Sequence, residues 1–294
     1  KRIQREFLLR IGMKIMSYIY NILDVILPFS WADYKFMKNA LLAIIVIAPL
    51  MGILGTMAVN NKMAFFSDAL GHSAVTGIAI GVLLGIQNST ISMIGFAIVF
   101  ALLLNQIKRK DLSSADTIIS VFSSFGLAVG LAILSMGGNF ARYGSLLIGD
   151  LLSISKTELL WLCIVSIIVV VFWYFCFNSL HGMSISSSLA RTKGVRIKLV
   201  DNIFVVVIAI VVTLCIKWVG LLIINALLIL PAAASRNIAK NVRSYHLFAV
   251  LFSVISGVVG LVLSFYLDIA TGPLIVILTS TLFFVTFFIR KCKS

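Results

Sequence analysis

The sequence predicts an all-α, polytopic helical membrane protein with about eight or nine transmembrane helices. The 294-residue chain is 61% hydrophobic and 12% charged, whereas a soluble domain has about 45–50% apolar and roughly 25% charged residues. Long apolar segments recur along the chain, and basic residues gather in every second connection between them, as the positive-inside rule requires. Together these observations leave little chain for a separate soluble domain.

Each predicted span is an apolar segment of about 17–25 residues, the length that crosses the hydrocarbon core of a bilayer. The nine segments lie at about 38–59, 64–86, 91–107, 116–136, 158–178, 201–217, 219–235, 245–266 and 273–289. Between the sixth and seventh segments, only Lys217 and Trp218 mark a turn. This stretch is therefore either two spans or one span followed by a re-entrant piece.

Lysine and arginine set the predicted orientation. One set of connections holds fourteen of these residues and the alternate set holds three, so the first set is expected to face the cytoplasm. With nine spans, the basic residues of segment 1–37 would fall on the outer side. We interpret 1–37 as an amphipathic segment lying at the membrane interface; the alternative is a tenth span over 15–33.

The remaining chain is predicted to form one transmembrane domain, 38–290, and a short cytoplasmic tail, 291–294. The net charge of +14 would suggest nucleic acid in a soluble protein. Here the basic residues lie in connections between spans, so topology explains the charge and no nucleic-acid partner is expected.

An ionisable pair lies inside the second segment. Asp68 and His72 stand four residues apart, so on a helix they share one face. A charge at the centre of a bilayer costs about 2.5–3.5 kcal/mol on insertion scales, so the pair needs a reason. A carboxylate oxygen and an imidazole nitrogen can both reach one divalent cation such as zinc, manganese or ferrous iron. Two ligands are too few, so others would come from another helix, a partner or water.

Two simpler explanations of the pair stay open on the residues alone. Asp68 and His72 could form a hydrogen bond that pins two helices together. Asp68 also follows Lys62 closely, so it could lie hydrated at the cytoplasmic rim.

Other polar residues in or beside the spans are weaker candidates for a pathway or gate. They are Asp116, Asp150, Asn225 and Asp268. A first-turn role behind a Ser113 or Ser114 cap also explains Asp116, and solvation explains Asp150 and Asp268. Asn225 is expected to form an interhelical hydrogen bond. His181 and His246 are predicted to be solvated in loops, and Pro231 to bend or end its helix.

Several functional classes have no motif in this chain. There is no GxxxxGK[ST] sequence, so the chain has no P-loop of its own for ATP. HExxH and GxSxG are also missing, so neither a zincin nor a serine hydrolase is indicated. A membrane-embedded scaffold or enzyme that uses the Asp–His pair for proton transfer remains an alternative without a motif behind it.

The largest cytoplasmic connection, at about 179–200, is expected to contain a short helix. Ser186 to Ser188 can cap it, Leu189 and Ala190 continue it, and Gly194 can end it. A short basic helix between two spans has the shape needed to dock on a soluble motor protein.

The sequence resembles the permease subunits of the zinc, manganese and iron ABC importers, the ABC-3 family, over most of 36–289. Five stretches carry the resemblance in the family's order: MAFFSDALGHSAVTGIAIG, SSADTIISVF, GSLLIGDLLSIS, VGLLIINALLILPAAASR and SFYLDIATGP. Asp68 and His72 stand at matching positions of the first stretch, and Asp116 matches an acidic position of the second. One departure is the run Ser186–Ser188, where the family often has acidic residues.

The resemblance implies an ABC-3-type importer transmembrane domain and a function. The chain would be a multi-pass permease in the bacterial cytoplasmic membrane, a transport subunit rather than an enzyme. Its partners would be a second copy of itself, two copies of an ATPase that binds ATP, an external solute-binding protein and membrane lipid. Asp68 and His72 would hold the metal in transit, Leu189, Ala190 and Gly194 would couple to the ATPase, and a metal chelate is an alternative cargo. Ligation needs an ionised carboxylate and a neutral imidazole, so transport should weaken as the pH falls.

Overall fold

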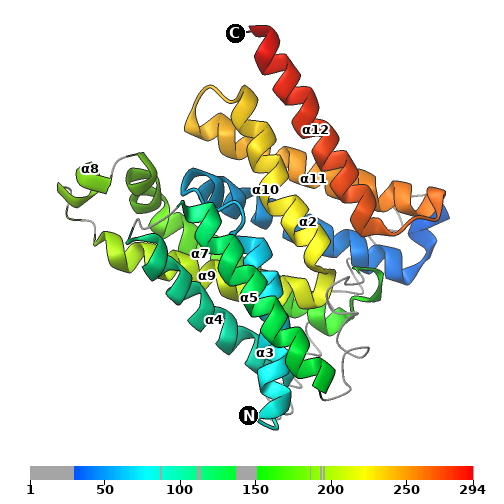
Figure 1. Ribbon diagram of the computed structural model, residues 1–294. Helices are drawn as coiled ribbons and strands as arrows, with labels where there is room; N and C mark the ends of the chain where they lie inside the picture. The colour runs from blue at the N-terminus through cyan, green and yellow to red at the C-terminus, as the bar shows by residue number, and fades with distance from the viewer. Residues whose placement is uncertain are drawn as a thin grey trace.

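The structure, a computed structural model, is built from helices (Figure 1). It describes residues 30–86, 88–110, 114–136, 151–185, 187–192, 194 and 196–293. Within these ranges the elements are η1 (Ser30–Asp33), α2 (Lys35–Asn60), α3 (Phe66–Leu83), α4 (Ser89–Lys108), α5 (Ala115–Met136), η2 (Leu151–Ser153), α7 (Lys156–Ile185), α8 (Ser187–Thr192), α9 (Ile197–Val219), α10 (Leu221–Ile238), α11 (Val242–Leu267) and α12 (Thr271–Lys293). No strand occurs in this part of the chain.

The predicted spans are confirmed in the described residues, where nine helices are long and apolar enough to cross a membrane. The uncertain stretch at 201–235 forms two helices, α9 and α10. They are separated by Gly220, whose φ of 103° is a conformation that glycine adopts without strain. Pro231 does not end its helix, because α10 continues to Ile238. Most of the predicted segment 1–37 lies outside the described residues.

Contacts between helix ends support the predicted alternation of the spans. The Arg109 side chain, at the end of α4, donates a hydrogen bond to the Lys198 carbonyl oxygen in the first turn of α9. At the other ends of the same two helices, the Lys217 ammonium contacts the Thr90 hydroxyl. α4 and α9 are therefore antiparallel, and their ends lie side by side. The charge pattern predicts this arrangement, because it places Lys108–Lys110 on the same side of the membrane as Arg196 and Lys198.

The helices divide into two groups, and α2 belongs to the group of α10, α11 and α12 (Figure 1). One group contains α3, α4, α5 and α9. In the other, α10, α11 and α12 pack against one another, and α10 and α11 also pack against α2. The outer helices α7 and α12 expose long apolar side chains such as Ile167, Phe175 and Phe288, which suits contact with lipid. By contrast, α3 is the least hydrophobic of the nine spans and the most enclosed, with 72% of its residues buried. Neighbouring helices thus shield most of its residues from lipid.

Small residues allow the central helices to approach closely. At Gly55 of α2, an added Cβ would overlap the Leu228 carbonyl group of α10. At Gly52, one turn earlier, it would lie 3.0 Å from the Ala249 oxygen of α11. These contacts are backbone to backbone, so no side chain can move aside, and they fix how α10 and α11 cross α2.

The short helix predicted in the connection at 179–200 is present as α8, which protrudes at the edge of the fold (Figure 1). Ala190 is buried with 2% exposure and its Cβ lies next to Gly182 of α7. Gly194 follows the helix with φ of 78°, and its N–H donates to the Arg191 carbonyl at 3.0 Å. α8 therefore rests on the end of α7 and is closed by a left-handed glycine.

The prediction that His181 and His246 are solvated in loops is wrong. His181 lies on α7 with 9% exposure, and His246 lies on α11. Their ring centroids are 5.0 Å apart, and both rings pack on Phe177. His181 lies beyond the predicted segment 158–178 because α7 continues to Ile185, whereas His246 lies within the predicted segment 245–266. Aromatic neighbours cover both imidazoles.

We expect Gly55→Ala to destabilise the protein by about 1–3 kcal/mol, because the new methyl group overpacks a backbone contact. Gly95→Ala is the matched control, since its Cβ would meet nothing within 4 Å on exposed helix α4. Thermal unfolding of the chain in detergent should show a lower Tm for Gly55→Ala alone. Equal Tm values for both variants would contradict the close α2–α10 contact.

Candidate metal site

Asp68 and His72 share one face of α3, as their spacing predicted. Asp68 lies in the first turn of the helix, and its Oδ2 is 3.4 Å from Nε2 of His72. The Asp68 side chain is 48% exposed and the His72 side chain 26% exposed. The pair is thus held within the fold and still open on one side.

Asn225 joins this pair from a distant part of the sequence. It lies in the second turn of α10, and its Nδ2 donates a hydrogen bond of 3.0 Å to Oδ1 of Asp68. The prediction of an interhelical hydrogen bond by Asn225 is confirmed, and its partner is Asp68. One carboxylate oxygen is therefore fixed by the amide, and the other faces the imidazole.

The meeting of α3 with α10 also bears on the depth of the site. α3 starts after a connection on the basic side, and α10 starts after Gly220 on the opposite side. If both helices spanned the full bilayer, their first turns would be a membrane apart. Their contact through Asp68 and Asn225 means that at least one helix begins inside the bundle. At 18 residues each, or about 27 Å at 1.5 Å per residue, they are the shortest of the nine spans.

The open side of the pair faces a small cavity of about 130 Å³. The residues that line it with Asp68 and His72 are Phe65, Ile119, Ser120, Ser123, Ser124 and Leu127. Three serines of α5 thus line the same cavity as the carboxylate and imidazole of α3. Sequence reasoning missed these serines, although Ser120 and Ser124 stand one helical turn apart in the run SVFSS.

Close packing of α3 on α5 creates this arrangement. The Thr76 hydroxyl donates to the Gly126 carbonyl oxygen, and a Cβ at Gly130 would lie 2.8 Å from the Thr76 Cα. Because glycine lets the two backbones approach, the preceding turns of α5 lie beside Asp68 and His72. The small residues act through the packing of the site and not as ligands.

Some polar atoms of the cluster have no protein partner. His72 Nδ1 and Asn225 Oδ1 are buried and make no hydrogen bond. Buried polar atoms are normally satisfied, so these atoms are suited to water or a cation. Within the described residues, no group of three or more His, Cys, Asp or Glu side chains could hold a metal. In the described part of one chain, Asp68 and His72 are therefore an incomplete donor set.

The other candidates for a pathway or gate lie elsewhere. Asp116 is exposed in the first turn of α5, where the Ser114 hydroxyl accepts a hydrogen bond from the Thr117 N–H at 3.2 Å as a helix cap. Asp268 is exposed and caps α11 with φ of 54°. Neither residue lines the cavity, and Asp150 lies outside the described residues.

In the described residues, nine helices long and apolar enough to cross a membrane hold the Asp68–His72 pair among them, and a short helix, α8, connects two of these helices. This is the architecture of a multi-span membrane protein. The chain belongs to the ABC 3 transport family, whose model matches residues 33–290. This agrees with the resemblance carried by the five sequence stretches.

Individual relatives cover nearly the same part of the chain. It is 33% identical to the high-affinity zinc uptake system membrane protein ZnuB of Haemophilus influenzae, covering 88% of this chain and 99% of that protein. It is 29% identical to the manganese import system permease protein ScaB of Streptococcus gordonii, covering 87% and 92%.

Solved structures share the fold. PsaBC from Streptococcus pneumoniae, in complex with Fab, matches with a TM-score of 0.75 at 26% identity, over 87% of this chain and 92% of that chain. An inward-facing putative metal-chelate type ABC transporter matches with a TM-score of 0.68 at 14% identity, over 87% and 86%. The second likeness is one of fold alone.

We expect Asn225→Ala to weaken divalent-cation binding by about 10–100-fold, the usual effect of losing a group that orients a ligand. Asn237→Ala is the matched control, because Asn237 lies on the same helix and donates to Thr286 of α12 at 3.3 Å. Equilibrium binding of radioactive zinc or manganese to the purified chain would measure both. An equal loss in the two variants would mean that general helix packing, and not Asp68, is responsible.

Proposed function

We propose that this protein is the membrane-spanning permease subunit of an ATP-driven divalent metal importer. The observation that carries the proposal is the Asp68–His72–Asn225 cluster opening on a serine-lined cavity. The relatives named for zinc and manganese uptake support this cargo class. The protein itself is a transport subunit, and ATP hydrolysis belongs to a separate chain.

The proposed cargo is zinc or manganese, with ferrous iron as a third candidate. A carboxylate oxygen and an imidazole nitrogen form a mixed donor set that accepts all three metals. The cavity of about 130 Å³ suits a bare or partly hydrated ion better than a bulky chelate. Serine hydroxyls around it can replace part of the water that the cation loses on entering.

We further propose that two copies of the chain enclose the pathway. The Asp68 side chain is 48% exposed, and α5 exposes Thr117, Ser120 and Ser124 on the same side. Polar side chains facing lipid would be unfavourable, so this face is better suited to a water-containing path between two protomers. A second Asp68 and His72 would then complete the donor set.

The remaining partners of the proposed importer follow from the family. An external solute-binding protein would deliver the cation, and two copies of a cytoplasmic ATPase would dock under α8 at Leu189, Ala190 and Gly194. The assembly would lie in the bacterial cytoplasmic membrane, and Asp116, Asp150 and Asp268 remain candidates for the path on either side of the site.

The chain's own residues would act in a simple order. Asp68, held by Asn225, presents one carboxylate oxygen, and His72 presents a ring nitrogen. Both bind the cation and replace part of its hydration shell. Movement of α8 on ATP binding tilts the spans and opens the site to the cytoplasm. Protonation of either ligand competes with the metal, so uptake should weaken as the pH falls.

We expect Asp68→Ala and His72→Ala each to lower uptake of radioactive zinc or manganese by about tenfold or more, because each removes a ligand. Cells would carry the chain with its candidate ATPase and binding protein, and exposed Asp33→Ala would be the control. Unchanged uptake after loss of both side chains would refute the site. Uptake that needs no ATPase would favour the proton-transfer alternative.

We expect Gly194→Val to lower both ATPase co-purification and uptake, because a β-branched residue is strained at φ of 78°. Gly194→Asn is the matched control, since asparagine tolerates this conformation. A Cβ at this position meets no atom within 4 Å, so the difference isolates the backbone. Equal behaviour of the two variants would show that the closure of α8 does not matter for coupling.

A further inference from the structure

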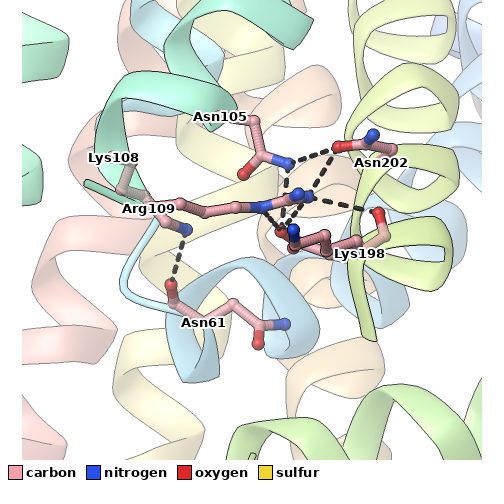
Figure 2. Close-up of polar contacts among 7 residues, drawn as sticks. Asn61, Asn105, Lys108, Arg109, Lys198 and Asn202 are labelled. Carbon is pink, nitrogen blue, oxygen red and sulfur yellow. Dashed lines mark hydrogen bonds and ion pairs between the residues drawn. The ribbon is translucent and has the colours of Figure 1, made fainter. Parts of the chain in front are cut away.

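A second polar cluster joins the end of α4 to the start of α9 (Figure 2). Arg109 donates to Oδ2 of Asp201 through Nε at 3.1 Å and through Nη2 at 2.8 Å. The same Nη2 atom donates to the Asn202 Oδ1 at 2.6 Å and to the Lys198 carbonyl at 3.3 Å. One guanidinium therefore holds three residues in the first turns of α9.

Asn105, one turn before Arg109, reinforces this connection. Its amide donates to Asp201 Oδ2 at 2.9 Å and to Asn202 Oδ1 at 3.1 Å, and the residue is 1% exposed. The side chains of Arg109 and Asp201 are only 26% and 14% exposed. Such a partly buried ion pair with additional hydrogen bonds holds the two helix ends firmly together, and we call it the Arg109–Asp201 joint. Removing either side chain would leave the other charge partly buried and unpaired.

The joint lies directly after the proposed ATPase-docking helix. α8 ends at Thr192 and α9 begins at Ile197, so only residues 193–196 separate α8 from the turn that Arg109 holds. A displacement of α8 therefore reaches α9 within one short connection. Because Arg109 fixes that turn of α9 to α4, the two helix ends should move together.

The other side of the joint leads toward the metal site. Lys108, next to Arg109, donates through Nζ to the Asn61 carbonyl at 3.4 Å (Figure 2). Asn61 caps the end of α2, and residues 62–65 then lead into α3, whose first turn contains Asp68. α4 also packs on α3 at Gly77, where an added Cβ would lie 3.0 Å from the Met93 Cα.

We propose that Arg109 and Asp201 are positioning residues that transmit the movement of α8 to the Asp68–His72 site. This inference rests on the proposed function, in which α8 docks on an ATPase. Neither residue lines the cavity, so the pair acts through α4 and the connection to α3 and not by binding the cation. The joint makes α8, α9, α4 and the start of α3 one mechanical unit.

The test uses the full complex of permease and ATPase in liposomes supplied with binding protein and zinc or manganese. It measures ATP hydrolysis and metal uptake in the same sample. Asp201→Asn keeps the shape and removes the charge, Arg109→Lys keeps the charge and loses the planar fork, and Asp201→Glu keeps a carboxylate. Exposed Lys110→Gln, adjacent to Arg109, is the matched control.

We expect Asp201→Asn and Arg109→Lys to hydrolyse ATP while moving about tenfold less metal per ATP, since an ion pair that anchors two elements is lost. Asp201→Glu should restore much of the ratio, Lys110→Gln should match the parent chain, and metal affinity should be unchanged. If Asp201→Asn and Arg109→Lys both moved as much metal per ATP as the parent chain, the inference would be overturned. So would parallel loss of ATPase association, Tm and uptake, which a purely structural clamp predicts.

Measurements on the unmodified complex distinguish a failure of the proposed function from a failure of the proposed role of the Arg109–Asp201 joint. If the unmodified complex shows no ATP-dependent metal uptake, the proposed function fails. If it transports metal and the disrupted variants keep its uptake per ATP, only the role of the Arg109–Asp201 joint fails.

Discussion

The hydrogen bond between Asn225 and Asp68 is the contact on which the candidate site depends. It ties the second turn of α10 to the first turn of α3, two helices that start from opposite sides of the fold. By occupying Oδ1, the amide leaves Oδ2 directed at His72. A carboxylate on the end turn of a helix would otherwise have several rotamers, so this bond fixes the direction in which its charge points.

The packing of α3 allows this polar turn to lie inside an apolar protein. α3 is the most enclosed span, and glycines at its crossings with α4 and α5 let the backbones approach. The outer helices expose apolar side chains suited to lipid, while serines of α5 line the cavity beside Asp68 and His72. A helix of low hydrophobicity can therefore sit in the bundle because other helices separate it from lipid.

The two polar clusters differ in how their charged side chains are enclosed. At the end of α4, Arg109 and Asn105 together donate five hydrogen bonds to the side chains of Asp201 and Asn202. At the start of α3, His72 Nδ1 and Asn225 Oδ1 remain without partners beside an open carboxylate. In the first cluster the two charged side chains are paired with each other, so this cluster holds helices together, although Asn105 Oδ1 is buried without a partner. In the second cluster the carboxylate and imidazole are open toward a cavity, so this cluster is the candidate for binding a cation. The same residue chemistry thus serves a joint in one place and a candidate binding site in the other.

The sequence by itself determined most of the spans, their alternation and the shared face of Asp68 and His72, while the structure decided that 201–235 forms two helices. These features follow from local rules: segment length against bilayer thickness, loop charge, and the angle between residues four apart. The short helix α8 and the glycine that ends it were also predicted from a local sequence pattern. Only the tertiary structure decided that Asn225 is the partner of Asp68, that α5 supplies serines, and that Arg109 binds Asp201. It also overturned the solvated loops expected for His181 and His246. Each of these contacts joins helices far apart in sequence, and backbone approach at small residues sets their register, which no local pattern of hydrophobicity or charge encodes.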